Sequence, residues 1–539
     1  MLKTYQRFFE VAGIFCFTLF LFTWGLSSQE VIGFDSRFYL FAQEMWRNGI
    51  SIFPTTYDQP YPDYPATAII VINLFAHLFG GLNKLIAVLP TAIMAALTLV
   101  LTYLIGERQK RCLGWFAVCL MLLTLTFFKA SRAITLDMYT TAVTTACFYV
   151  IYSADRKNKI KYIAWIYPLL LLGFIFRGPI GLVVPAGVIC VYYLLAGQIK
   201  KFLVIGFSAF VLLAISTSLL LACAYQIGGE SFMQAVLRME VLGRMGGGKL
   251  PYYFYFTESL GSYALAYPFA LATFIGVFYY TWLKRLTIPD ANFLLKLFGW
   301  AAVVLIGMSI PGDKKVRYVL PIVPALALLA AYPFTTWQEE KYFQQWRKFF
   351  RGLFLYFPLF FLLAIEVVFF NRKQFGLRVN IYSLTTVYLF FQSCSFWFYY
   401  HYIDRIKLRE VAVVFFAAMS FVVAEIAVLE PMELQLEKAR AFVVAMEAVR
   451  LHDHAQLVFY KENPDSLPIK YLINMPQREK PIFIQAITEL KQVTSPTFFV
   501  TSVENFMRLP PRLITTFRII GRERMGHVEV VVFSNVKKK

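Results

Sequence analysis

Apolar runs about as long as a membrane is thick recur along this chain and set the limits on its fold. An α-helix needs about 20 apolar residues to cross the hydrocarbon core of a bilayer. Only 16% of the 539 residues are charged and 59% are hydrophobic, whereas soluble domains carry about 25% charged residues. We therefore exclude a soluble multidomain enzyme and expect an all-α polytopic membrane protein. Its thirteen expected spans are 8–26, 84–105, 113–129, 136–153, 160–176, 179–196, 202–225, 261–283, 292–309, 318–335, 350–370, 381–402 and 409–429.

The net charge of +20 does not indicate nucleic acid as a partner. The sequence contains no zinc-finger spacing and no glycine-rich phosphate loop. In a chain this apolar, basic residues more often mark the cytoplasmic loops of a membrane protein. The seven Cys lie within or beside apolar runs without CxxC spacing, so we expect them to be small buried hydrophobic residues.

The distribution of Lys and Arg predicts the orientation of the spans. The run 67–80 has only 14 residues, which as a helix measures about 21 Å and is short for a span. If this run does not cross, the short basic loops at 107–111, 155–161, 198–201, 284–290, 338–348 and 404–409 share one side with the N-terminus. Cytoplasmic loops carry such clusters. We therefore expect 67–80 to be a juxtamembrane or re-entrant helix, with the N-terminus inside, the C-terminus outside and an uncleaved first span.

The expected outer side holds two long loops, 27–83 and 226–260, and an unusual number of cations. An anionic substrate at the outer membrane face is one reason for cations on the translocated side. Solvated loops or contacts with lipid headgroups are the alternative. The cations are Arg132, Arg177, Arg238, Arg244, Lys249, Lys314, Lys315 and Arg317.

Residues 430–539 differ in composition from the first 429 and are expected to form a small soluble α/β domain, while 1–429 form the transmembrane domain. An amphipathic helix is expected at 432–450, and shorter helices near 486–492 and 503–507. The pair His452 and His454 could suggest a metal, but two positions apart on a helix end they point to different faces. The tail shows no catalytic motif. Its expected strands are 457–460, 471–473, 481–483, 497–500, 517–520 and 528–533.

Two carboxylates stand where chemistry at a membrane surface could use them. Asp35 follows the first span, where solvent is restricted, and a carboxylate there can act as a general base or orient a nucleophile. Asp137 begins the fourth span. Both residues could instead be helix N-caps.

Motifs along residues 5–340 resemble those of the GT-C glycosyltransferases. Asp35-x-x-x-Tyr39, Ala42-x-Glu44-Met45, Gly49, Pro54, Tyr61-x-x-Tyr64-Pro65 and Leu78-Phe79-Gly80 resemble their first periplasmic loop. Further matches are Arg132-x-x-x-x-Asp137, Arg177-Gly178-Pro179, Glu240-x-x-x-Arg244 with Pro251-x-x-x-Tyr255, and Lys314-x-x-x-Tyr318-x-x-Pro321-x-x-Pro324. The branch most similar to this chain comprises the lipid A aminoarabinose transferases and the bacterial enzymes similar to protein mannosyltransferases.

This resemblance implies a GT-C fold in a bacterial inner membrane and an inverting transfer of a sugar from a polyprenyl-phosphate donor. The acceptor would be lipid A or lipopolysaccharide, another envelope glycan or a protein on the periplasmic side, and the enzyme a monomer among membrane lipids. Asp35 and Asp137 would be the catalytic residues. The donor phosphate would meet Arg177, Arg244 and Lys314, then Arg132, Lys249 and Arg317, and substrate would contact Tyr39, Asp63, Tyr64, Glu240 and Tyr318.

Two positions depart from the family pattern. Asp63-Tyr64 stands where the family often has a carboxylate followed by Lys, and Gly248 where it often has His three residues before the proline of the central loop. With five His in the whole chain, we expect no zinc site and no cofactor, and leave open a divalent metal.

Two other functions stay open at this point. A flippase or other transporter of lipid-linked sugars would show broken helices and ionisable residues in mid-span. Glu366 and Glu425 lie within spans, but near their expected outer ends, and no inverted repeat is evident. A family member that has lost activity is the other alternative. The sequence identifies neither the sugar nor the acceptor.

Overall fold

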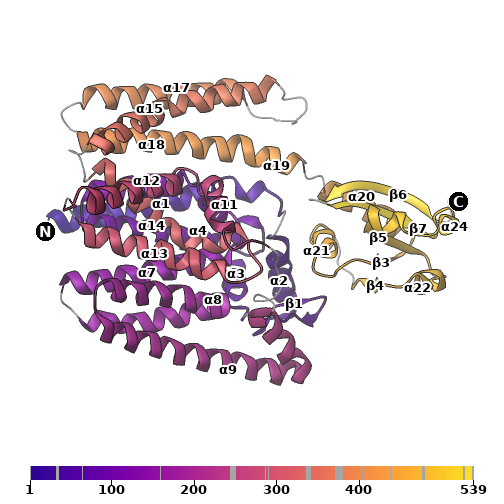
Figure 1. The fold of residues 1–539 in the computed structure, drawn as a ribbon. Coiled ribbons are helices and arrows are strands. Elements are labelled where there is room, and N and C mark those ends of the chain that lie inside the picture. Colours follow the sequence, from indigo (N-terminus) through magenta and orange to yellow (C-terminus); the bar gives the residue numbers. More distant parts are fainter. Residues whose placement is uncertain are drawn as a thin grey trace.

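The computed structural model describes a helical body with a smaller C-terminal lobe at one end (Figure 1). The N-terminus lies at the end of the body opposite this lobe, and α2 and β1 lie at the end next to it (Figure 1). The described residues are 2–31, 35–63, 65–157, 160–242, 250–285, 287–288, 290–335, 341–370, 380–402, 406–436, 439–475, 480–525 and 528–536.

The body is built from helices whose apolar side chains pack into one large core. In the first loop, β1 (Thr55–Thr56) and β2 (Gln59–Pro60) form a small antiparallel hairpin. The α-helices are α1 (Leu2–Thr23), α2 (Asp35–Asn48), α3 (Thr67–Leu78), α4 (Lys84–Glu107), α5 (Arg111–Leu122), α6 (Leu125–Ser131), α7 (Leu136–Lys157), α8 (Ile166–Leu195), α9 (Ile199–Leu237), α11 (Phe254–Ser262), α12 (Ala266–Phe278), α13 (Ala291–Ser309), α14 (Val323–Thr335), α15 (Lys341–Phe370), α17 (Ile381–His401), α18 (Ile406–Ala424) and α19 (Glu430–Leu436). The 3₁₀-helices are η1 (Leu26–Ser28), η2 (Ile160–Trp165) and η5 (Val316–Ile322), and the π-helices are η3 (Arg238–Leu242), η4 (Tyr279–Leu283) and η6 (Glu425–Leu429).

The expected count of thirteen spans is not confirmed. Within the described ranges, nine helices are long and apolar enough to cross a membrane, or ten if α5 and α6, bent by 77°, count as one broken span. The difference lies in α7 and α17, which are not among the nine, and in the expected spans 160–176 and 179–196, which both fall in one helical segment, Lys161–Leu195. The run 67–80 forms the 12-residue helix α3.

A sharp turn at Gly178 divides α8 into two arms. Gly178 has φ 63° and ψ −153°, a conformation outside the helical region that is open to glycine. Gly173 and Gly181 would lie about 12 Å apart on a straight helix. Instead, a Cβ built on Gly173 falls 2.0 Å from the carbonyl oxygen of Gly181. The arms therefore pack against each other through these two glycines.

Polar side chains also join helices within the apolar body. Gln392 of α17 donates a hydrogen bond from Nε2 to the carbonyl of Leu355 (2.9 Å), and its Oε1 accepts one from the N–H of Leu359 (3.1 Å). These two groups belong to the same turn of α15, which also contains Pro358. The Gln392 amide therefore bonds a backbone carbonyl and a backbone N–H that are four residues apart on one turn of α15.

The C-terminal lobe contains a five-stranded sheet in the order β4-β3-β5-β7-β6. Strands β3 (Gln456–Tyr460), β4 (Ile482–Ile484) and β5 (Thr497–Ser502) run parallel, and β6 (Arg518–Met525) and β7 (Val528–Ser534) are antiparallel to their neighbours. Apolar clusters cover the two faces of the sheet. The helices are α20 (Ala439–His452), α21 (Leu467–Leu472), α22 (Ile487–Gln492), α23 (Val503–Met507) and α24 (Pro511–Ile514).

Most elements expected in the tail are present, and one expectation is wrong. The segment 471–473 is not a strand, because residues 467–472 form α21, with Pro468 in its first turn where the missing N–H costs nothing. The helix expected at 432–450 falls on α19 and α20, with 437–438 outside the described residues. The boundary between 429 and 430 stays a prediction.

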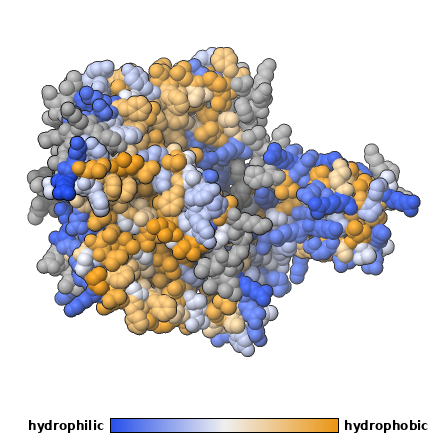
Figure 2. All heavy atoms as spheres, in the orientation of Figure 1, coloured by the Kyte–Doolittle hydropathy of each residue, from blue (hydrophilic) through white to orange (hydrophobic). Residues whose placement is uncertain are grey.

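The surface of the molecule divides in the same way as the fold. Figure 2 shows hydrophobic side chains over most of the visible face of the helical body and mainly hydrophilic ones over the C-terminal lobe. An apolar surface of this extent on helices agrees with a lipid-facing body. The surface over the lobe agrees with a part exposed to water.

Candidate active site

Asp137 is held between two arginines from distant parts of the chain. It is the second residue of α7, and its side chain is 8% exposed. Arg177, at the turn of α8, places Nε 3.0 Å from Oδ1, and Arg317, in η5, places Nε 3.2 Å from Oδ2. The sharp turn at Gly178 sets Arg177 at the end of a helical arm, where it can face Asp137.

Asp35 is the first residue of α2 and is 5% exposed. Its Oδ1 accepts a hydrogen bond from the N–H of Ile134 at 3.1 Å. Burial raises the pKa of Asp35 from 3.8 to about 6, although Lys84, the N–H of Ile134 and Arg317 favour the ionised form. Arg317 therefore acts on both carboxylates. The site brings together the first loop, the second loop (residues 132–135, between α6 and α7) and the start of η5.

Lys84 also belongs to this site, although no motif in the sequence singles it out. It is the first residue of α4, its charge acts on Asp35, and its Nζ donates to Gln29 Oε1 at 2.9 Å. In the sequence, Lys84 is only the start of an expected span. A cation at the expected outer end of an apolar run was the available signal, since positive residues are less frequent on that side.

Arg132 lies near this cluster but contacts other partners. Its Nε lies 2.5 Å from Glu430 Oε1, and its Nη2 donates to Glu430 Oε2 at 2.7 Å. Nη1 and Nη2 also donate to the carbonyls of Leu21 (2.8 Å) and Trp24 (2.9 Å). Four of the five N–H groups of a guanidinium are thus accounted for. Arg132 ties the second loop to α1 and to α19.

Lys314 and Tyr318 lie on the loop and the 3₁₀-helix that carry Arg317. Lys314 is 5% exposed, and its Nζ donates to the carbonyls of Pro311 (2.7 Å) and Leu250 (3.3 Å). The Tyr318 ring lies 5.8 Å from the guanidinium carbon of Arg177 and equally far from that of Arg317. Tyr318 therefore packs against the two arginines that hold Asp137.

Of the six other expected site residues, the structure describes three. The hydroxyl of Tyr39, on α2, donates to the carbonyl of Leu82 at 3.3 Å. Asp63 and Glu240 are each 5% exposed, the first in the first loop and the second in η3. The remaining three, Tyr64, Arg244 and Lys249, lie outside the described residues, as does Gly248. Within the described ranges, no three His, Cys, Asp or Glu side chains gather as a metal site would require.

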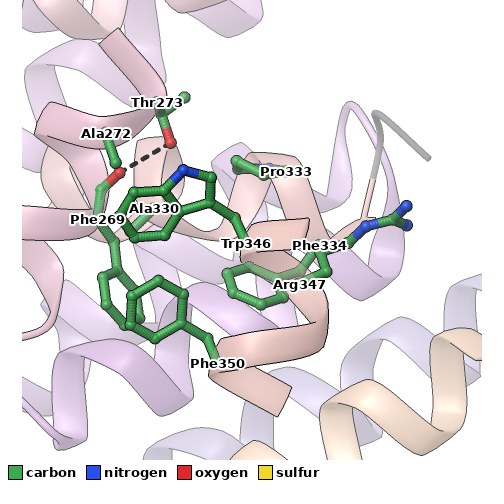
Figure 3. Close-up of a pocket in the computed structure, with 9 residues that line it drawn as sticks. All are labelled: Phe269, Ala272, Thr273, Ala330, Pro333, Phe334, Trp346, Arg347 and Phe350. Carbon is green, nitrogen blue, oxygen red and sulfur yellow. Dashed lines mark hydrogen bonds between the residues drawn. The ribbon is translucent and has the colours of Figure 1, made fainter. Parts of the chain in front are cut away.

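A small apolar pocket lies elsewhere, between α12, α14 and α15 (Figure 3). Its volume is about 20 Å³, room for about one water molecule. It lies at the end of α14 away from η5, so it is separate from the carboxylates. Its lining residues are Phe269, Ala272, Thr273, Ala330, Pro333, Phe334, Trp346, Arg347 and Phe350.

The sequence matches a family model and several curated proteins over part of its length. Residues 63–221 match the family model described as dolichyl-phosphate-mannose-protein mannosyltransferase. An undecaprenyl phosphate-α-4-amino-4-deoxy-L-arabinose arabinosyl transferase from Sodalis glossinidius is 26% identical over 55% of this chain and 53% of the relative. An uncharacterized protein from Aquifex aeolicus is 24% identical over 54% of this chain and 56% of its own length. The matches thus span about half the length of these curated relatives.

A solved structure extends the comparison to the whole fold. ArnT from Cupriavidus metallidurans, crystallised with undecaprenyl phosphate, superposes with a TM-score of 0.67 at 17% identity, over 98% of both chains. This chain has the GT-C fold of the aminoarabinose transferase type. The resemblance inferred from the motifs is confirmed. The apolar helices and these relatives together indicate a multi-pass protein of a bacterial inner membrane.

Proposed function

We propose that this chain is an inverting glycosyltransferase that moves a sugar from a polyprenyl-phosphate donor to an acceptor at the periplasmic face of the inner membrane. The observation that carries the proposal is the cluster around Arg317, whose guanidinium contacts Asp137 and whose charge acts on Asp35. Two carboxylates and several cations in a poorly solvated site suit a reaction that activates a nucleophile and releases a phosphate.

The positive charges of the site suit a leaving group that is a lipid phosphate. As the bond between sugar and lipid phosphate breaks, negative charge grows on the phosphate, and fixed cations at a site with little water stabilise it strongly. Four cations come from three separate parts of the chain: Arg177 from α8, Lys84 from α4, and Lys314 with Arg317 from the segment at the start of η5. Arginine can also bind phosphate through two parallel hydrogen bonds. Arg132 forms an ion pair with Glu430, so we propose that it holds the second loop in position and does not bind the donor phosphate.

The two carboxylates suit the activation and orientation of the acceptor. A general base works best when its pKa lies near the operating pH, and burial raises the pKa of Asp35 to about 6. We therefore assign Asp35 to removing the proton from the acceptor. Asp137, held by Arg177 and Arg317, orients these arginines and the acceptor. A base on the face of the sugar opposite the phosphate gives inversion.

The names of the relatives support the donor class. The arabinosyl transferases are named for undecaprenyl phosphate carrying an aminoarabinose, and ArnT was crystallised with undecaprenyl phosphate. We extend the lipid-phosphate donor to this chain. Lipid A, another envelope glycan and a protein are the acceptor classes that the proposal includes. The C-terminal lobe faces the periplasm in this proposal.

Mass spectrometry of polyprenyl-phosphate lipids tests the function. The source cells would be compared with and without the gene, and the deletion complemented with wild type, Asp35→Asn or Arg317→Gln. We expect a sugar-bearing polyprenyl phosphate to accumulate in the deletion and to be cleared by the wild type only. Arg7→Gln is the matched control, since Arg7 pairs with Glu107 at the other end of the body. Clearance by the Asp35→Asn protein, or no accumulation, contradicts the proposal.

A further inference from the structure

The first loop contains a tight turn in a conformation that its sequence does not favour. Between β1 and β2, Tyr57 has φ 56° and Asp58 has φ 61°. A two-residue turn with both central residues in the left-handed region normally takes Asn, Asp or Gly. Asp58 meets this preference, whereas a tyrosine in this region costs free energy that other contacts must offset.

Helix α2 holds this turn from one side. Glu44 is 2% exposed, and its carboxylate accepts hydrogen bonds from the N–H of Tyr57 (2.8 Å) and the N–H of Asp58 (3.3 Å). Asn48 Nδ2 donates to Asp58 Oδ1 at 2.8 Å. The turn is therefore fixed to the same helix that begins with Asp35.

The C-terminal lobe holds the turn from the other side. The hydroxyl of Tyr57 donates to the carbonyl of Pro464 at 2.5 Å, and its ring lies 5.3 Å from that of Phe483 in an edge-to-face arrangement. Tyr57 also packs against the apolar cluster of the lobe that includes Val443, Phe459 and Tyr471. On α2 itself, Arg37 donates to the carbonyl of Asp465 at 3.2 Å.

We propose that Tyr57 latches the C-terminal lobe to α2 and that this docking holds Asp35 in place for sugar transfer. The inference rests on the proposed function. An asparagine or glycine in place of Tyr57 would form the turn without strain, but only a long side chain reaches the lobe. The docking contacts of Tyr57 therefore offset the strain of its backbone. Tyr57, Glu44 and Arg37 are positioning residues, because they act on the reaction through Asp35.

The groups that face Asp35 determine how its pKa would change if the C-terminal lobe separated from α2. They are Lys84 from α4, Arg317 from η5 and the N–H of Ile134 before α7, and none of them belongs to the lobe. If α2 moves, these groups stay while Asp35 gains water. Its pKa should then fall from about 6 toward the ordinary value of 3.8.

Purified full-length protein with four substitutions tests the latch. Tyr57→Asn removes the side chain that reaches the lobe and suits the turn, Tyr57→Phe removes only the hydroxyl, and Arg37→Gln weakens the second contact without touching the turn. Tyr382→Asn is the control, since Tyr382 is 80% exposed on α17. The donor is the sugar-bearing polyprenyl phosphate recovered from the deletion strain. The measurements are kcat, the KM for this donor, the pH dependence of kcat and the distance between spin labels on α2 and α20.

For Tyr57→Asn we expect kcat to fall at least about tenfold, since small displacements of a catalytic group cost up to about 100-fold. Donor KM should change little, the acid limb of the pH profile should move to lower pH, and the label distance should broaden. Tyr57→Phe should retain most of kcat, and Arg37→Gln should fall between the two.

Two outcomes overturn the latch. In the first, Tyr57→Asn broadens the label distance but keeps the wild-type kcat and pH profile, which shows that docking does not position Asp35. In the second, the label distance in Tyr57→Asn and Arg37→Gln equals that of wild type, which shows that these residues do not hold the lobe. If the wild type transfers no sugar, the proposed function fails, and the label distances still decide whether Tyr57 docks the lobe.

Discussion

Replacing Asp35 by asparagine should stabilise the folded protein at neutral pH while it abolishes sugar transfer. Burial raises the pKa of Asp35 from 3.8 to about 6, so the folded state binds this proton more tightly than the unfolded state. At about 1.4 kcal/mol per pH unit, the difference between these two pKa values corresponds to about 3 kcal/mol. The folded protein loses this free energy when the buried carboxylate ionises.

The direction of the Asp35 pKa shift determines the pH range in which wild type and variant differ in stability. Because the folded pKa lies above the unfolded one, the favourable contribution of the protonated form is complete below about pH 4 and is lost as the pH rises through about 6. The amide side chain of the Asp35→Asn protein does not ionise, so the variant escapes this loss. The gap in the free energy of unfolding should therefore be small near pH 4 and about 3 kcal/mol in favour of the variant near pH 7.5.

Thermal unfolding of the purified protein in detergent, followed by tryptophan fluorescence between pH 4 and 8, measures this gap. We expect the melting temperature of Asp35→Asn to exceed that of wild type by a few degrees near pH 7.5 and to approach it at low pH. Glu504→Gln is the control, because Glu504 is an exposed carboxylate on α23. A variant that melts below wild type by the same margin at every pH refutes the burial argument.

Two further predictions concern the arginine cluster and the turn of α8. Arg317→Gln removes a contact of Asp137 and a positive charge that lowers the pKa of Asp35. We therefore expect kcat to fall about 100-fold and the acid limb of its pH profile to move to higher pH. An unchanged pH profile contradicts the assignment of Arg317 to both carboxylates. Gly181→Ala places a Cβ within 2.0 Å of a facing carbonyl, whereas the nearest atom to a Cβ at Gly187 lies 3.6 Å away. In fluorescence-detected size exclusion, Gly181→Ala should lose monodisperse protein while Gly187→Ala should not, and equal loss in both variants argues against the close packing of the two arms.

Elements with a strong hydrophobic period could be predicted from the sequence, and short apolar segments could not. The run expected at 84–105 is α4 (Lys84–Glu107), and α3 lies where a short apolar helix was expected. By contrast, 471–473 has apolar residues that suit a strand or a buried helix equally. Pro468 at the start of α21 was the local signal for a helix.

Site residues that belong to a sequence motif could be predicted. Contacts between residues far apart in the sequence could not. The sequence singled out Asp35, Asp137, Arg177 and Arg317, and the structure brings Asp137 together with both arginines. The pairing of Arg132 with Glu430 joins residues 298 positions apart. No local pattern encodes such a contact, since it depends on how α19 packs against the second loop.

The amide of Gln392 in the turn of α15 has a consequence for biosynthesis. Pro358, within this turn, lacks the N–H that would bond the carbonyl of Phe354, and its ring crowds that carbonyl. In hydrocarbon, backbone groups left without partners cost several kcal/mol each. Gln392 of α17 supplies the partners for Leu355 and Leu359. These two hydrogen bonds can form only when α17 lies beside α15, so we expect this turn of α15 to be completed after α17 has been synthesised.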